Sequence, residues 1–328
     1  MAMFIEPQAG VTPIIQVIAQ AQHSIDLNAY ELTDHSVLAA LQAARQRGVQ
    51  VRILLETTPY GARPSWVAHE VAAAQATGAT VHAPPPAFRG AWVYDHAKYL
   101  CTGRLCAIGT ANFTEAAFHR NREAIEVTAQ PSVVAAARAV FAADWTGTSV
   151  PVGAARWLIL SPGAGPVIGT LLDQAGGVCV ETEEMGNDRG ILRVLERQGA
   201  AAHVVLPDRI ARAQIGNVER LVAAGVQVRQ MPPPRYIHAK IIAGARWVYL
   251  GSQNFTSTSL DRNREMGITV IGADAAALRA QCVADWQRAT PFGNGQTAGT
   301  AGRASSWVRR GGAMLARHTL LRVLLHGG

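Results

Sequence analysis

The sequence predicts an α/β protein made of two tandem units, each a mixed sheet flanked by helices. The first observation behind this prediction is an internal repeat, because His96-Ala97-Lys98 returns as His238-Ala239-Lys240, 142 positions later. The second observation is that apolar residues in each unit alternate between the spacing of strands and the spacing of helices. Strands that alternate with helices imply a parallel or mixed sheet covered on its faces.

The residues that follow each His-Ala-Lys also recur at the same offset. Two copies of one fold need the same apolar residues for packing, but packing does not require the same polar residues. A duplicated polar set is better explained by a chemical site. A Gly/Ser/Pro-containing stretch at 146–153 separates the copies, so we predict units at 1–150 and 151–290 and a tail at 291–328. The recurring residues are Gly109, Asn112, Phe113, Thr114, Arg120, Asn121, Arg122 and Glu123, which return as Gly251, Asn254, Phe255, Thr256, Arg262, Asn263, Arg264 and Glu265.

In the first unit, each predicted element has its own signal. Three isoleucines at 14–18 share one helical face, and 24–30 alternates like a strand. Asp34 is a suitable N-cap residue for the next helix, which Gly48 ends. The same reasoning predicts strands at 49–55 and 79–82, helices at 66–76 and 133–145, a hairpin of 98–102 and 105–109, and a strand at 124–128, and the second unit follows the same order.

The repeated polar residues fall where these elements can bring them together. His96 and Lys98 stand two apart at the start of a strand, so their side chains point to the same face. The turn at 109–112 ends the hairpin and can place Asn112 at the same edge, and Glu123 comes where the following strand begins. We therefore predict that His, Lys, Asn and Glu of each copy converge.

Two histidines with two lysines suit displacement at phosphorus. Histidine titrates near neutrality, so it can attack or transfer protons, and lysine supplies a fixed point charge for an anion. With two copies, one histidine can attack and become a phosphohistidine while the other protonates the leaving oxygen. Lysine and asparagine donors would hold the non-bridging oxygens. The sequence contains no cluster of metal ligands, and this chemistry needs no metal or other cofactor.

The duplicated pattern resembles the two His-x-Lys motifs of the phospholipase D superfamily. The resemblance rests on His96-Ala97-Lys98 with Gly109-Thr110-Ala111-Asn112 and on His238-Ala239-Lys240 with Gly251-Ser252-Gln253-Asn254, and it covers about residues 1–290. It implies that the two copies pack as a pseudo-twofold dimer around one site. It also implies that His96 is the nucleophile, that His238 is the general acid, and that Lys98 and Lys240 bind the phosphate.

The resemblance also implies roles for the remaining repeated residues. Glu123 would orient His96 and Glu265 would orient His238, although structural ion pairs with Arg122 or Arg264 are an alternative for these acids. Thr110 and Ser252 would either donate to phosphate or close the turn. The implied substrate-binding residues are Asn112, Asn254, Thr110 and Ser252.

Composition and departures from the motif bear on the substrate. A net charge of +7 points to an anionic partner, either phospholipid or nucleic acid. The family's Asp five residues after each Lys is replaced by Gly103 and Ala245, which weakens a phospholipid-specific assignment more than it weakens catalysis. We predict a phospholipase D-type phosphodiesterase that functions as a monomer. The alternatives are a nuclease or DNA-repair phosphodiesterase and a cardiolipin synthase-type phosphatidyl transferase.

The remaining expectations concern the surroundings of the protein. The four cysteines form no Cys-x-x-Cys and mostly lie in apolar runs, so we predict buried free thiols in a reducing, cytoplasmic compartment. Residues 1–22 resemble a domain start rather than a signal peptide, and no apolar run is long enough to span a membrane. Residues 306–325 could form a basic amphipathic helix that holds the protein peripherally on an anionic membrane, or a disordered basic tail.

Overall fold

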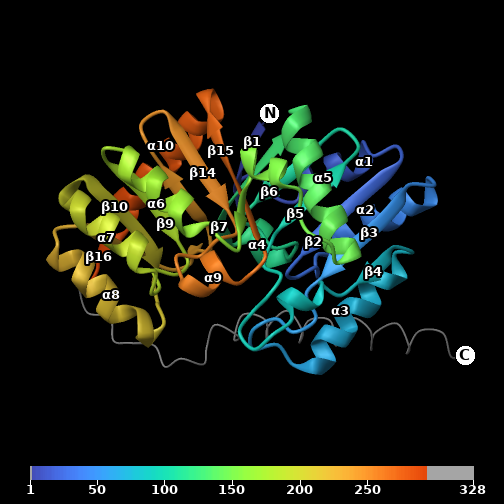
Figure 1. Ribbon diagram of the computed structural model, residues 1–328, viewed down its shortest axis with the longest axis horizontal. Helices are drawn as coiled ribbons and strands as arrows, with labels where there is room; N and C mark the ends of the chain where they lie inside the picture. Colours follow the sequence, from blue (N-terminus) through green and yellow to red (C-terminus); the bar gives the residue numbers. More distant parts are fainter. Residues whose placement is uncertain (1, 294–328) are drawn as a thin grey trace, which may run out of the picture.

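The computed structural model describes residues 2–293 and consists of two α/β halves that lie side by side (Figure 1). The predicted amphipathic segment at 306–325 lies outside the described residues. The elements of the first half, in chain order, are β1 (Ala2–Glu6), α1 (Thr12–Ala19), β2 (Ser24–Ala29), α2 (His35–Gln46), β3 (Gln50–Leu55), α3 (Pro64–Ala76), β4 (Thr80–His82), β5 (Tyr99–Thr102), β6 (Cys106–Gly109), α4 (Glu115–His119), β7 (Asn121–Thr128) and α5 (Pro131–Thr146).

The second half repeats this order with small additions. Its elements are β8 (Ile159–Ser161), α6 (Gly165–Gln174), β9 (Val178–Thr182), α7 (Arg189–Gln198), β10 (Ala202–Pro207), α8 (Arg212–Ala223), β11 (Gln227–Met231), β12 (Tyr236–Ile237), β13 (Lys240–Ala243), β14 (Trp247–Gly251), α9 (Ser257–Asp261), β15 (Glu265–Ile271), α10 (Gly272–Arg288) and β16 (Thr290–Pro291).

The two sheets have the same topology, which confirms the predicted fold class. The strand order is β1-β7-β6-β5-β2-β3-β4 in the first half and β8-β15-β14-β13-β9-β10-β11 in the second, with β16 added at the edge. The neighbours β2-β3-β4 in the first half and β9-β10-β11 in the second run parallel. The other neighbours in these two strand orders pair antiparallel, so both sheets are mixed. The local signals also hold, because the Asp34 side chain accepts hydrogen bonds from Ser36 N at 2.9 Å and Val37 N at 3.0 Å and so caps α2.

One apolar core joins the halves. Tyr99 and Phe141 of the first half share a buried cluster with Ile241 and Leu278 of the second, and all four side chains are at most 1% exposed. The cluster lies where α5, α10 and the hairpin strands of both halves meet. Because the two copies bury apolar surface in a common core, each half is held in a fixed orientation against the other.

Strand pairing also crosses between the halves. Strand β12, which leads into the second His-Ala-Lys, pairs in parallel with the start of β7 in the first half, with Tyr236 opposite Asn121 and Ile237 opposite Arg122. The reciprocal contact is a bridge from Asp95 to Arg264. Each histidine motif is therefore anchored to the opposite sheet, as a pseudo-twofold contact requires.

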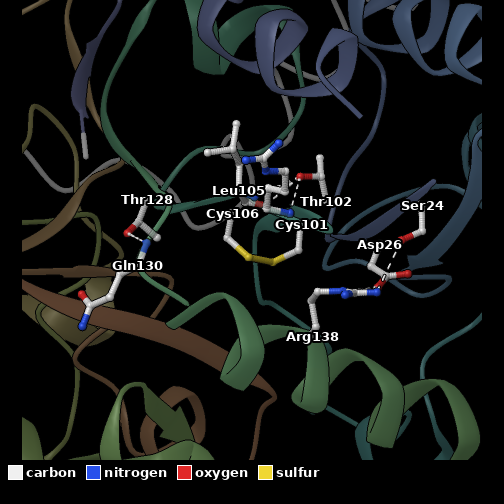
Figure 2. Close-up of a disulfide and its surroundings, with 10 residues drawn as sticks. Ser24, Asp26, Cys101, Thr102, Leu105, Cys106, Thr128, Gln130 and Arg138 are labelled. Carbon is white, nitrogen blue, oxygen red and sulfur yellow. Dashed lines mark hydrogen bonds and ion pairs between the residues drawn. A yellow bond between two sulfur atoms is a disulfide. The ribbon is translucent and has the colours of Figure 1, made fainter. Parts of the chain in front are cut away.

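The prediction of free thiols is wrong, because the four cysteines form two disulfides. Cys101 and Cys106 lie opposite each other in the β5–β6 hairpin (Figure 2), and Cys179 of β9 is bonded to Cys282 of α10. No sequence spacing indicated these pairs, since adjacent strands and a helix packed on the sheet bring the residues together. Among residues 2–293, no helix is long and apolar enough to cross a membrane.

We expect the two disulfides to contribute unequally to stability. The Cys179–Cys282 bond joins residues 103 apart, whereas Cys101–Cys106 joins residues 5 apart. If cross-links act mainly by restricting the unfolded chain, the long loop contributes about 4–5 kcal/mol and the short one about 2 kcal/mol. Denaturant unfolding of Cys179→Ala/Cys282→Ala and Cys101→Ala/Cys106→Ala tests this with the same atoms removed in both variants. Equal losses would contradict the argument from loop length.

Candidate active site

The two His-Ala-Lys segments occupy equivalent positions in the two halves. Each precedes a hairpin, and each lysine folds back so that Nζ donates to the carbonyl of its own histidine, at 2.7 Å for Lys98 to His96 and 2.6 Å for Lys240 to His238. Both lysines are at most 2% exposed, whereas the side chains of His96 and His238 are 12% and 11% exposed. The histidines are thus the part of each motif that reaches solvent.

The histidine–glutamate pairs cross between the copies, which corrects the predicted pairing. Nδ1 of His96 lies 2.9 Å from Oε2 of Glu265, and Nδ1 of His238 lies 2.7 Å from Oε1 of Glu123. Both glutamates are fully buried. Each acid therefore contacts the histidine from the other half at Nδ1, and Nε2 is the ring nitrogen left for other contacts.

The physical reason for the crossing is the exchanged strand pairing. His96 N donates to Arg264 O at 2.8 Å, and His238 N donates to Arg122 O at 3.2 Å. The residue after each arginine is the glutamate, so pairing along the opposite sheet places each histidine beside the other copy's acid. The alternative of ion pairs with the neighbouring arginines does not hold, because Arg122 binds Asp285 and Arg264 binds Asp144.

Thr110 and Ser252 lie in the buried turns that follow the two motif hairpins. Both are fully buried, and the Thr110 hydroxyl donates to Glu123 Oε2 at 2.6 Å while accepting from Ala124 N at 3.0 Å. Ser252 Oγ accepts from Met266 N at 3.0 Å. Of the two roles considered, these contacts favour closing the turn over donating to phosphate. The preceding Gly109 is required because a Cβ there would collide with the Ala124 carbonyl.

The asparagines lie at the edge predicted for them. Asn112 and Asn254 are each 8% exposed, and Asn112 Nδ2 donates to Glu31 Oε2 at 3.1 Å. Glu31 was not a predicted site residue, and burial raises its pKa. The Oδ1 atoms of both asparagines have no hydrogen-bond partner among residues 2–293. Substrate binding by this pair stays a prediction.

Sequence reasoning missed Tyr30 and Glu183, which lie against the two motifs. The Tyr30 ring packs edge-on to His96 with centroids 4.6 Å apart and lies 5.0 Å from Lys98 Nζ. Glu183 Oε2 accepts from Lys240 Nζ at 2.9 Å. Aligning the ends of β2 and β9 across the repeat would have pointed to both, because each comes directly after the strand that pairs with its motif hairpin.

Burial sets the charge states around the first motif. It lowers the pKa of His96 from 6.5 to about 4, and the charges of Lys98 and Lys240 act in the same direction against the opposing effect of Glu265. Burial also lowers the pKa of Lys98 from 10.5 to about 7. At neutral pH His96 is therefore uncharged, which is the form that can attack an electrophile.

Comparisons with known proteins point to one family. A family model described as "Cardiolipin synthase, PLD-like domain" matches residues 14–145 and 187–286. Proteins named phospholipase D from Rickettsia felis and Rickettsia bellii are 34% identical over 118 and 122 residues, which is 36% and 37% of this chain. The matched segments cover 55% and 57% of those relatives, so the chain spans little more than half of their length.

Solved structures share the fold at low sequence identity. The phosphatidylserine synthase of Haemophilus influenzae superposes with a TM-score of 0.70 at 12% identity and covers 88% of this chain and 87% of that protein. The polyphosphate kinase of Porphyromonas gingivalis gives a TM-score of 0.63 at 16% identity over 87% of this chain and 46% of the kinase. These likenesses support the two-copy α/β fold.

Proposed function

Because the chain belongs to the phospholipase D superfamily, we propose that it hydrolyses phosphodiester bonds of phospholipids through a covalent phosphohistidine, without a metal. The observation that carries the proposal is the reciprocal pair of histidines, each fixed at Nδ1 by a buried glutamate of the other copy. A histidine fixed in this way presents Nε2 in a defined direction, as a nucleophile or a proton donor must.

In the proposed reaction, His96 Nε2 attacks phosphorus and the bond to the leaving oxygen breaks on the opposite side. His238 gives its Nε2 proton to that oxygen. A water molecule then gives a proton to the neutral His238 as its oxygen attacks phosphorus and displaces His96. Lys98 and Lys240 balance the negative charge of the non-bridging oxygens, with Asn112 and Asn254 as additional donors.

Two features support a lipid substrate. The sequence relatives are named phospholipase D. An exposed aromatic pair also lies close to the first motif, because Tyr60 and Trp92 are each 63% exposed with ring centroids 5.6 Å apart, and Tyr60 N donates to the Tyr30 hydroxyl at 2.6 Å. Tryptophan and tyrosine favour the interface between water and lipid, so this pair suits contact with a membrane surface.

The test is turnover in chelator on labelled phospholipid vesicles and labelled single-stranded DNA in parallel, with His96→Ala as the blank. Release of phosphatidic acid with intact DNA supports the proposal. The net charge of +7 favours the nuclease alternative, which cleaved DNA with intact lipid would establish. The description of the matching family model favours phosphatidyl transfer, which would appear as a new phospholipid when an alcohol acceptor is added.

We expect activity to be highest on the acidic side of neutrality. His96 must be uncharged to attack, and burial lowers its pKa to about 4, so activity falls only below about pH 4. Lys98 must be charged to bind phosphate, and burial lowers its pKa to about 7, so activity falls again above that pH. The pH dependence of kcat/KM measures both limits. Lys98→Arg, which stays charged, should move the alkaline limit upward, and a parent enzyme at full activity at pH 9 would contradict the argument.

A further inference from the structure

The two halves of the site differ at the residue that follows β2 in the first copy and β9 in the second. Tyr99 and Ile241 each lie three residues after a motif histidine, so they are equivalent positions. Tyr99 pairs with Asn28 of β2, and Ile241 pairs with Glu181 of β9. Two residues beyond each strand partner, the first copy has Tyr30 and the second has Glu183. A neutral aromatic ring therefore stands in one half where a carboxylate stands in the other.

On the first side, no carboxylate of residues 2–293 lies within ion-pair distance of His96 Nε2. The Tyr30 ring packs against His96, and its hydroxyl is engaged by Tyr60 N. The one acidic partner of His96 among residues 2–293 is Glu265, at Nδ1. Lys98 adds a nearby positive charge, which opposes protonation.

On the second side, the carboxylate of Glu183 faces the motif. Its Oε2 lies 2.9 Å from Lys240 Nζ and 3.4 Å from His238 Nε2, and its Oε1 accepts from the Tyr236 hydroxyl at 3.1 Å. Burial alone would raise the pKa of Glu183, but the charges of His238 and Lys240 outweigh burial and lower it. Glu183 is thus an ionised carboxylate held next to the outer nitrogen of His238.

The position of this carboxylate affects the two histidines unequally. His238 lies between two carboxylates, with Glu123 Oε1 2.7 Å from Nδ1 and Glu183 Oε2 3.4 Å from Nε2. An opposite charge at this distance favours the charged form of histidine. Glu31 is another carboxylate whose charge acts on His238, but burial raises its pKa, so Glu183 is the ionised carboxylate that faces His238 Nε2.

We propose that Glu183 is a positioning residue whose carboxylate faces His238 Nε2, orients that imidazole and stabilises its charged form, and thereby makes His238 the general acid and His96 the nucleophile. This inference rests on the proposed phosphohistidine mechanism. In the first step the His96 lone pair forms the N–P bond, the P–O bond electrons go to the leaving oxygen, and the Nε2 proton passes from His238 to that oxygen. Glu183 stays ionised throughout, and His238 becomes neutral.

The test is Glu183→Gln, which removes the charge and keeps the shape. In full-length protein labelled at histidine Cε1, the His238 resonance is assigned by its loss in His238→Ala and is followed against pH by NMR. We expect the His238 resonance to titrate at lower pH in Glu183→Gln than in the parent protein, with a smaller change at His96. The matched control is Glu196→Gln, whose carboxylate binds the exposed side chain of Arg220 and should leave both titrations unchanged.

An unchanged His238 titration in Glu183→Gln, or equal shifts at both histidines, would overturn the proposal. The titration needs no substrate, so it separates this inference from the proposed activity on lipid. Where turnover is measurable, the alkaline limit of kcat/KM for Glu183→Gln should also move to lower pH, because both His238 and Lys98 lose a nearby negative charge, with parent activity retained at acidic pH. A structural role alone would lower activity at every pH.

Discussion

His96→Ala and His238→Ala are each expected to abolish turnover, by on the order of 10⁴-fold or more, while the fold survives. The reason is that the proposed reaction uses the two imidazoles in different steps of one displacement, so neither replaces the other. Both side chains are partly exposed and lie outside the apolar core, so their removal leaves no large cavity. Turnover on vesicles, together with the thermal unfolding midpoint, measures both parts of the prediction.

The two variants should differ in what they accumulate. The clearest substrate is a phosphodiester whose leaving group needs no protonation. In His238→Ala, His96 can still attack this substrate, but no general base activates water for the second step. A phosphohistidine should therefore build up at His96. His96→Ala should form none. His119→Ala is the control, because that histidine is exposed and lies outside the site. Full activity in either motif variant, or a phosphohistidine at position 238 alone, would contradict the assigned roles.

The sequence predicted the fold and the repeated residues of the site, because both follow from comparison of the two copies. The 142-residue offset implied two like units, and among the polar residues that recur, Glu123 and Glu265 lie against the two motif histidines. Element positions followed from local chemistry, as the Asp34 cap shows. These features depend on neighbouring residues or on comparison of the copies, so one sequence was sufficient for them.

Features that depend on how the copies meet could not be predicted. The repeat indicates that Glu123 and Glu265 are equivalent. The symmetry is satisfied whether each glutamate contacts the histidine of its own copy or that of the other copy. Only the exchange of β12 onto β7 decides it. The Cys179–Cys282 disulfide similarly depends on α10 packing against β9, and no equivalent cysteines in the first copy indicated it. Glu183 has Tyr30 as its counterpart in the first copy, so agreement between the copies did not indicate it.

The contact between the halves leads to the second large expected effect, which is a loss of stability in Arg122→Met. Arg122 and Asp285 form an ion pair at most 2% exposed, in which Nη2 donates to Oδ1 at 3.3 Å and Nε donates to Oδ2, and Nη1 binds Gln8 Oε1 at 2.9 Å. Removing the guanidinium leaves the Asp285 carboxylate buried without its cation. The expected cost is about 3–5 kcal/mol in the free energy of unfolding, measured by denaturant titration.

A double-mutant cycle separates the pair from the packing around it. Arg122→Met/Asp285→Leu removes both charges, so it should recover most of the loss, since apolar replacement of a whole buried pair is often neutral or stabilising. The symmetry supplies an internal replicate, because Arg264 binds Asp144 at 2.8 Å across the same contact, and Arg264→Met should cost a similar amount. Additive losses in the double variant would mean that the two charges are not coupled. The backbone carbonyl of Arg122 accepts a hydrogen bond from His238 N. Recovery of stability without recovery of activity would therefore mean that the ion pair of the Arg122 side chain positions the catalytic histidine as well as joining the two halves.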